Sequence, residues 1–173
     1  MAAAGGAVIK HYRDLAFMGF TEVIKNLPAI FKNLAFCKKD IAEFQPDVLI
    51  LIDYPGFNMR IAKWAHPIKY KVVYYISPQI WAWKENRVHA INRDTDKMLV
   101  ILPFEKAFYK KYGYEADYVG HPLAEVIGEW QKQHADIKKD KIIAIQPPSR
   151  TKEIEKKSPI MPQVAPTFPK FNF

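Results

Sequence analysis

Short apolar runs alternate along this chain with segments in which apolar residues recur at helical spacing. The apolar runs predict strands over residues 47–52, 71–76, 97–102, 115–119 and 141–145. The segments between them predict helices over residues 58–65, 84–91, 104–112 and 123–133. Such alternation is typical of an α/β protein with a doubly wound parallel sheet. Asn58 is a candidate N-cap of the first of these helices, and Gly113 a candidate C-cap of the third.

The front of the chain carries one apolar stripe instead. Its members recur at helical spacing: Phe20, Val23, Ile24, Leu27, Phe31 and Leu34. Pro28 predicts a kink or a junction between two shorter helices. Lysines are interspersed with the stripe, so it could lie on a membrane surface, although periodicity alone favours packing in a core.

The segment 71–83 is the most informative part of the sequence. A β-branched and aromatic run, Val72 to Ile76, ends at Ser77-Pro78, and Trp81 and Trp83 follow in what we expect to be a loop. The carboxyl ends of strands are where open α/β sheets bind ligands, which favours a binding role for the two rings. The alternative is that both rings simply pack under the loop.

Polar side chains follow several of the predicted strands. They are Asp53, Ser77, Gln79, Glu105, His121, Ser149 and Arg150. Because the carboxyl ends of parallel strands share one edge, these groups could converge on a single crevice. Asp53 could act there as a general base, or it could cap the following turn. His121 could bind a phosphate or a hydroxyl, although a structural histidine in a turn is more frequent.

Asp94-Thr95-Asp96 has the spacing of a metal-binding acidic pair but precedes its strand, which places it at the opposite edge of the sheet. We expect no metal site there, and the sequence has no His/Cys cluster, glycine-rich dinucleotide motif or P-loop. Cys37 is the single cysteine, so an internal disulfide is excluded. The start has no secretory-signal pattern, and no apolar run reaches the roughly 18 residues of a membrane span.

The charge distribution changes this interpretation in one respect. The net charge is +8, and residues 60–111 carry eleven Lys or Arg against four Asp or Glu, a local excess of +7. Such a basic face attracts phosphate groups of nucleotides, lipids or nucleic acids. We expect no nucleic-acid partner, since no recognised reading motif is present.

Five ordered segments resemble the lipid-A-disaccharide synthase family. They are Leu15–Val23 (LAFMGFTEV), Ile52–Asn58 (IDYPGFN), Ser77–Trp83 (SPQIWAW), Leu102–Glu105 (LPFE) with Phe108-Tyr109 after it, and Val119–Leu123 (VGHPL). The resemblance implies an inverting glycosyltransferase of lipid A biosynthesis with two Rossmann-like domains of the GT-B type. It implies that UDP-2,3-diacylglucosamine is joined to 2,3-diacylglucosamine 1-phosphate, without a cofactor or metal, at the inner face of the cytoplasmic membrane of a Gram-negative bacterium.

The resemblance also assigns roles to residues. Asp53 would be the base for the acceptor hydroxyl, and Arg150 would hold the nucleotide diphosphate. The implied substrate-binding residues are Ser77, Gln79, Trp81, Trp83, Glu105, His121, Ser149 and Arg150. With acylated substrates, the apolar stripe is better interpreted as lipid-facing, over Phe17, Met18, Phe20, Val23, Ile24, Leu27 and Phe31.

Two departures from the family pattern fall near the end of the chain. Gln146-Pro147-Pro148-Ser149 stands where the family has Leu-Pro-Gly-Ser, and Pro159, Pro162 and Pro166 interrupt the helix expected after Arg150. We therefore expect residues 1–133 to be an acceptor-side domain lacking its first strand, and 134–173 a linker with the truncated start of a nucleotide-sugar domain. Such a partial chain would have impaired activity alone. The alternatives are a non-catalytic phospholipid-binding protein of the membrane surface and a nucleotide-binding module unrelated to lipids.

Overall fold

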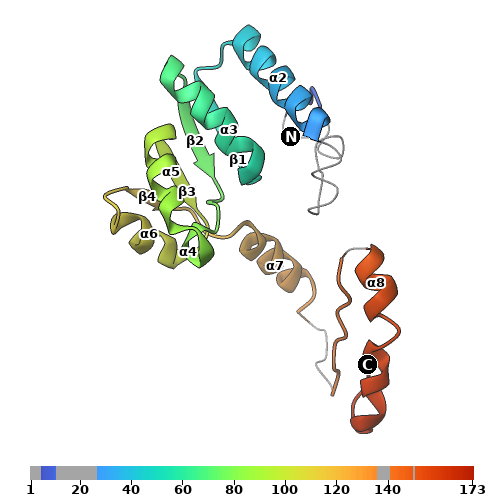
Figure 1. Ribbon diagram of the computed structural model, residues 1–173. Helices are drawn as coiled ribbons and strands as arrows, with labels where there is room; N and C mark the ends of the chain where they lie inside the picture. The colour runs from blue at the N-terminus through green and yellow to red at the C-terminus, as the bar shows by residue number, and fades with distance from the viewer. Residues whose placement is uncertain (1–4, 11–26, 136–140, 150) are drawn as a thin grey trace. The chain divides into compact units, whose positions relative to one another are not determined.

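A computed structural model describes residues 5–10, 27–135, 141–149 and 151–173. Four strands form one parallel sheet in the order β1-β2-β3-β4 (Figure 1). They are β1 Val48–Ile52, β2 Lys71–Tyr75, β3 Lys97–Val100 and β4 Ala116–Tyr118. In the register of the ladder, Leu51 pairs with Tyr74 and Tyr75 with Leu99. The predicted parallel α/β fold is confirmed.

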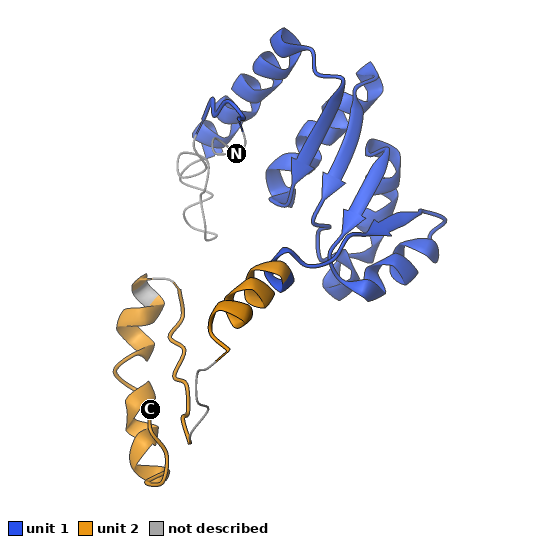
Figure 2. Cartoon of the chain, turned by 180° about the vertical axis from the view of Figure 1, so that it is seen from behind, with its two compact units in different colours: residues 1–124 blue, residues 125–173 orange. Residues whose placement is uncertain are grey.

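Helices connect the successive strands along one face of the sheet. After α2 (Leu27–Phe44) these elements are α3 (Pro55–Ala65), η3 (His66–Ile68), α4 (Ile80–Trp83), η4 (Glu85–Arg87), α5 (Val88–Asp94) and α6 (Pro103–Lys110). Helix α7 (Pro122–Gln133) follows β4 and connects no strands. Helices α3, α5 and α6 cover the face seen in Figure 1, whereas Figure 2 shows the strands from their uncovered side. A strictly sequential strand order with helices on one face is the pattern of one half of a doubly wound sheet.

The burial of the strands follows this one-sided cover. The fully buried strand residues Val72, Tyr74, Met98 and Val100 pack with Ile61 of α3 and its neighbours in a single apolar core. The alternate residues of β1, Val48, Ile50 and Ile52, are exposed. Side chains of a strand alternate between the two faces, so the covered face carries the core.

Three local predictions were wrong. Helix α3 starts at Pro55 rather than at Asn58, because proline suits the first helical turn, and Asn58 therefore lies inside the helix and is not its N-cap. Trp81 and Trp83 lie in the short helix α4 rather than in a loop, and the helix predicted over 84–91 is formed by η4 and α5 instead. The C-cap of α6 is Lys111 rather than Gly113; Gly113 lies two residues further on, where its φ of 70° suits the turn that follows the helix.

The chain forms two compact units, Met1–Ala124 and Glu125–Phe173, coloured separately in Figure 2. The second unit contains α8 (Thr151–Lys157) and η5 (Met161–Thr167), and their separation confirms that the prolines prevent one continuous helix. The strand predicted over 141–145 was wrong: the described residues form only an isolated bridge between Ile142 and Asn172. A strand requires several consecutive residues paired with a neighbouring strand, and a single bridge pairs only one residue. The domain boundary expected after residue 133 stays a prediction.

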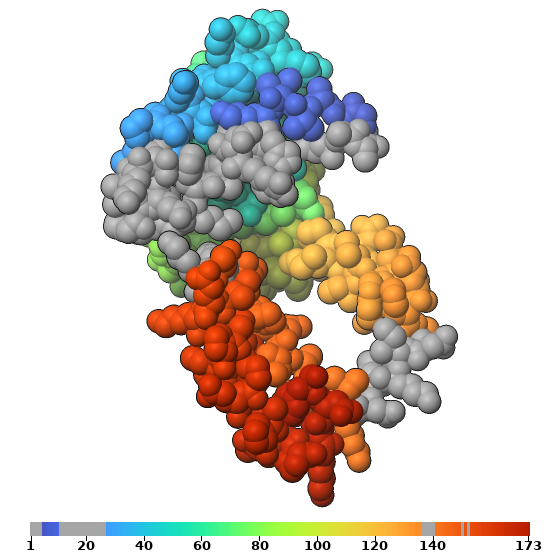
Figure 3. Space-filling model, turned by 90° about the vertical axis from the view of Figure 1, so that its right-hand side faces the viewer, coloured from blue at the N-terminus to red at the C-terminus, as the bar shows by residue number. Residues whose placement is uncertain are grey.

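The apolar stripe at the front of the chain is described only from Leu27 onward. Leu27 and Phe31 of α2 are exposed, Phe31 to 60%, whereas Leu34 is buried at 7% exposure. The surface of α2 is drawn in light blue in Figure 3. Phe17, Met18, Phe20, Val23 and Ile24 lie outside the described residues. Among the helices that are described, none has the length and apolarity to cross a membrane.

Candidate functional site

A hollow of about 320 Å³ lies at the carboxyl ends of the first three strands. Its lining comes from the turn after β1, the turn after β2 and the start of α6. The lining residues are Asp53, Pro55, Ile76, Ser77, Pro78, Gln79, Trp83, Ile101, Leu102 and Glu105. Five of the predicted site residues therefore share one hollow. Its lining contains two acids and no basic residue, so its own charge is negative.

The turn after β1 holds Asp53 in a strained backbone conformation. Asp53 and Tyr54 have φ values of 47° and 45°, and Ile76, across the hollow, has 66°. A left-handed conformation costs an ordinary residue about 1–2 kcal/mol, and most for a β-branched one. The Asp53 carbonyl accepts hydrogen bonds from the Tyr74 hydroxyl and the Asn58 side-chain amide, both at 2.7 Å. These bonds hold the turn, and strain of this kind is concentrated at functional sites.

The Asp53 carboxylate itself is exposed and has no hydrogen bond or ion pair with the described part of the chain. Its influence is visible in its neighbour: burial, and secondly the charge of Asp53, raise the pKa of Tyr74. Tyr74 therefore stays protonated and keeps donating to the Asp53 carbonyl. An unpaired carboxylate at the mouth of a hollow is able to accept a proton from a bound hydroxyl.

Ser77 and Glu105 form the floor of the hollow. Ser77 is 5% exposed, and its hydroxyl donates to the Pro78 carbonyl at 3.0 Å and lies 2.6 Å from the Tyr109 hydroxyl. Glu105 is 1% exposed and accepts a hydrogen bond from the Leu102 backbone N–H at 2.9 Å, in the first turn of α6. Both side chains are thus engaged with the protein and fix the shape of the hollow.

Gln79 and Trp83 form the open wall. Gln79 is exposed, and its amide makes no hydrogen bond to the described residues. The Trp83 ring is 69% exposed, with the Lys84 ammonium 4.6 Å from its centroid. A free amide and an exposed aromatic face are groups that bind sugar hydroxyls and the apolar faces of rings.

The other predicted site residues are not in this hollow. Trp81 is half-buried and packs edge-on against Phe104 at 4.9 Å, with an indole N–H that has no partner among the described residues. His121 accepts a hydrogen bond from the Leu123 N–H at the start of α7. Ser149 belongs to the second unit, and Arg150 lies outside the described residues.

The acidic pair lies at the opposite end of the strands, as predicted. Asp96 accepts a hydrogen bond from the backbone N–H of Val72, at the start of β2, and Asp94 pairs with Arg93 at 2.6 Å. No group of three or more metal-ligating side chains occurs among the residues that the structure describes. The two carboxylates therefore bind protein groups near the amino ends of the strands.

Sequence reasoning missed four residues that shape the site. Asn58, Tyr74 and Tyr109 hold its turns through hydrogen bonds, and Ile76 carries a strained backbone. The sequence did offer a signal for the two tyrosines. Each places a hydroxyl on an otherwise apolar face, and a buried phenol needs a hydrogen-bond partner. No signal in the sequence marks the conformation of Ile76.

A parallel sheet with connecting helices on one face, and a ligand-sized hollow at the carboxyl ends of its strands, defines a Rossmann-like α/β protein. Comparison with known families narrows the class. The family model described as lipid-A-disaccharide synthetase matches residues 1–170, so the chain belongs to this family of glycosyltransferases of lipid A and lipopolysaccharide biosynthesis.

Individual relatives agree with the family match. The chain is 47% identical to the lipid-A-disaccharide synthase of Acidobacterium capsulatum, over 73% of this chain and 32% of that protein. It is 41% identical to lipid-A-disaccharide synthase 1 of Legionella pneumophila strain Paris, over 95% of this chain and 45% of that protein. The chain is 39% identical to the lipid-A-disaccharide synthase of Nitrosococcus oceani, over 95% of this chain and 44% of that protein. The chain thus spans less than half the length of these relatives.

Proposed function

We propose that this chain forms the acceptor side of a glycosyltransferase that condenses UDP-2,3-diacylglucosamine with 2,3-diacylglucosamine 1-phosphate. The products are the lipid A disaccharide 1-phosphate and UDP. The observation that carries the proposal is the Asp53 carboxylate, without a partner among the described residues, at the mouth of a hollow on the carboxyl edge of the sheet in a member of this family. Because the chain spans less than half of its relatives, we expect it to have impaired turnover alone.

Asp53 is the general base in this proposal. It takes the proton of the acceptor hydroxyl while that oxygen bonds to the anomeric carbon of the donor sugar. The bond from this carbon to the diphosphate breaks on the opposite side, UDP leaves with the electron pair, and the anomeric configuration inverts. The strained turn keeps the carboxylate at the rim, where it meets the hydroxyl without first breaking a bond to any of the described residues.

The walls of the hollow bind the acceptor sugar. Gln79 offers an amide to hydroxyl groups, and Trp83 offers an exposed ring to the apolar face of the sugar. Ser77 and Glu105 shape the floor. Trp81 and His121, which lie outside the hollow, are further substrate-binding residues in this proposal. Ser149 and Arg150 serve the nucleotide diphosphate, a role that suits the fork of donors on arginine.

The protein works at a membrane surface in this proposal, peripherally on the inner face of the cytoplasmic membrane of a Gram-negative bacterium. The exposed side chains of Leu27 and Phe31, with the lysines around them, support it. Acylated substrates reside in that membrane, so an apolar and cationic surface brings the hollow to them.

Disaccharide formation tests the proposal with Asp53→Asn, which keeps the shape of the side chain but removes its basicity. We would assay the chain alone and a chimera in which it replaces the aligned segment of the Legionella relative. In the chimera, the loss of a general base should lower turnover by roughly 10²- to 10⁴-fold. Asp47→Asn, at the other end of the same strand, is the matched control and should leave turnover unchanged. Equal turnover with Asp53→Asn would refute the role of the base, and acceptor binding by an inactive chimera would favour a phospholipid-binding protein.

A further inference from the structure

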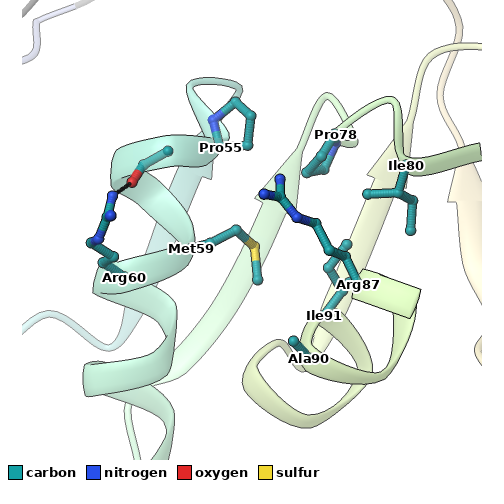
Figure 4. Close-up of a pocket in the computed structure, with 9 residues that line it drawn as sticks. Pro55, Met59, Arg60, Pro78, Ile80, Arg87, Ala90 and Ile91 are labelled. Carbon is teal, nitrogen blue, oxygen red and sulfur yellow. Dashed lines mark hydrogen bonds between the residues drawn. The ribbon is translucent and has the colours of Figure 1, made fainter. Parts of the chain in front are cut away.

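A second hollow lies beside the first, between α3 and α5, with Pro55 and Pro78 shared by both linings (Figure 4). Its volume is about 280 Å³. Apolar side chains form most of its wall: Pro55, Met59, Pro78, Ile80, Ala90 and Ile91. An alkyl chain entering such a hollow leaves water for an apolar lining.

Arg87 gives this hollow a cationic mouth. Figure 4 shows its side chain extending between Met59 and Pro78, and its guanidinium carbon lies 5.8 Å from the centroid of the Trp83 ring. Within the described residues, Arg87 has no ion pair with a carboxylate. It also lines a smaller hollow of about 50 Å³ together with Lys84 and Trp83. Lys84 lines only this smaller hollow, whereas Arg87 lines both.

Arg60 differs from Arg87 although it lines the same hollow. Its guanidinium donates a hydrogen bond to the Gly56 carbonyl within α3, on the side of the helix that faces away from Arg87 in Figure 4. The two arginines thus have the same charge but different orientations. This makes Arg60 a matched control for the role of Arg87.

The two hollows have opposite charge. Asp53 and Glu105 line the first and repel phosphate, whereas the mouth of the second offers the Arg87 guanidinium, which has no carboxylate partner in the described part of the chain, beside an apolar wall. A guanidinium is well matched to a phosphate monoester. We propose that the second hollow binds one acyl chain of an acylated sugar phosphate, with the phosphate on Arg87 and the sugar passing over Pro55 and Pro78 toward Asp53. The identity of the sugar rests on the proposed function; the alkyl and phosphate contacts do not.

Soluble alkyl phosphates test these contacts without turnover. Titration calorimetry of the chain with decyl phosphate, below its micelle concentration, should show one saturable site. Octyl phosphate should bind about fifteenfold more weakly, since each buried methylene is worth about fourfold in affinity. Decyl glucoside, with the same chain and no charge, should bind about tenfold more weakly than decyl phosphate.

Three variants identify the site. Arg87→Gln should remove the advantage of decyl phosphate over decyl glucoside, whereas Arg60→Gln should retain it. Ala90→Leu fills the apolar wall and should abolish the difference between the octyl and decyl chains. Ala82→Leu, an exposed position outside both hollows, is its control and should preserve that difference. Circular dichroism of each variant shows that it is folded.

Several results would overturn the proposal: no binding below the micelle concentration, affinity independent of chain length, or equal losses with Arg87→Gln and Arg60→Gln. The last would indicate general attraction to a basic surface. These failures differ from failure of the proposed function. An Asp53→Asn chimera with full turnover refutes the base but leaves alkyl phosphate binding intact, whereas absent alkyl phosphate binding with Asp53-dependent turnover refutes only the acyl site.

Discussion

The hydroxyl pair of Ser77 and Tyr109 provides a quantitative test of how the floor of the first hollow is held. The two oxygens lie 2.6 Å apart, and both side chains are buried. Ser77 also donates to the Pro78 carbonyl, whereas the Tyr109 hydroxyl has no second hydrogen bond to the described residues. The two partners are therefore not equivalent. Ser77→Ala leaves a buried phenol unpaired, but Tyr109→Phe leaves Ser77 with one of its bonds.

The expected changes in stability follow from this asymmetry. A neutral hydrogen bond contributes about 1 kcal/mol net, and a buried polar group left without a partner costs about 1–3 kcal/mol. Tyr109→Phe should therefore lower the free energy of unfolding by about 1 kcal/mol, and Ser77→Ala by about 2 kcal/mol. The double variant removes both polar groups and should be no less stable than Ser77→Ala alone. This corresponds to a coupling of about 1 kcal/mol.

Urea unfolding measures these differences. The transition can be followed by the fluorescence of the half-buried Trp64 and Trp81, and a constant m-value shows that the unfolded state is unchanged. Tyr112→Phe is the matched control, because its hydroxyl also makes a 2.6 Å bond, to Glu85, but at an exposed position. This control variant should leave the free energy of unfolding unchanged. If the double variant equals the sum of the single ones within about 0.5 kcal/mol, the hydroxyl pair is not coupled and the reasoning is refuted.

Three further predictions concern the turn and the sheet. Asn58→Ala removes two hydrogen bonds, at 3.0 and 2.7 Å, to the carbonyls of Ile52 and Asp53. It should lower the free energy of unfolding by about 1 kcal/mol and slow turnover of the chimera. Unchanged turnover would show that catalysis does not depend on these bonds. Burial raises the pKa of Tyr74, so above pH about 10 the unfolded state loses this proton first, and stability should fall by up to about 1.4 kcal/mol per pH unit. Urea titrations in this range should show a shallower fall in Tyr74→Phe, and an identical slope would contradict the assignment. Lys97→Gln should return the lowered pKa of Asp117 toward its ordinary value by NMR, with no change in melting temperature, because the pair is exposed.

Sequence patterns could predict the sheet and the residues at its edge. Apolar runs ending in proline identify β1 to β3, and the polar residue after each run, such as Asp53 or Ser77, then has only one edge on which to lie. The separation of the two tryptophans could not be predicted. Trp81 and Trp83 are two apart in a single helical turn, so they project to different sides, and only the position of Phe104 decides which ring is covered.

The strained turns lay beyond sequence reasoning for a different reason. A positive φ at Gly or Asn has a signature, but Ile76 has none, because its conformation is imposed by the bonds around it. Its N–H donates to the Leu99 carbonyl at 3.0 Å, so the chain is still attached to β3 when it turns. Likewise, the Asp53 N–H donates to the Tyr75 carbonyl at 2.9 Å before its own turn. These are tertiary contacts between strands, and a single strand's sequence does not contain them.

The prolines after the strands explain why one edge carries both hollows. Pro55, Pro78 and Pro103 each follow a strand within a few residues; Pro55 and Pro103 begin helices, and Pro78 stands two residues before α4. Proline cannot extend a ladder and suits a first helical turn, so the chain must leave the sheet at the same level each time. The amino ends of α3 and α6 consequently face the edge that holds Asp53 and Glu105, and their dipoles favour negative charge there. The first hollow therefore has a negative lining without any basic residue, and the cation proposed to bind phosphate, Arg87, lines the second hollow, on the other side of Pro55 and Pro78.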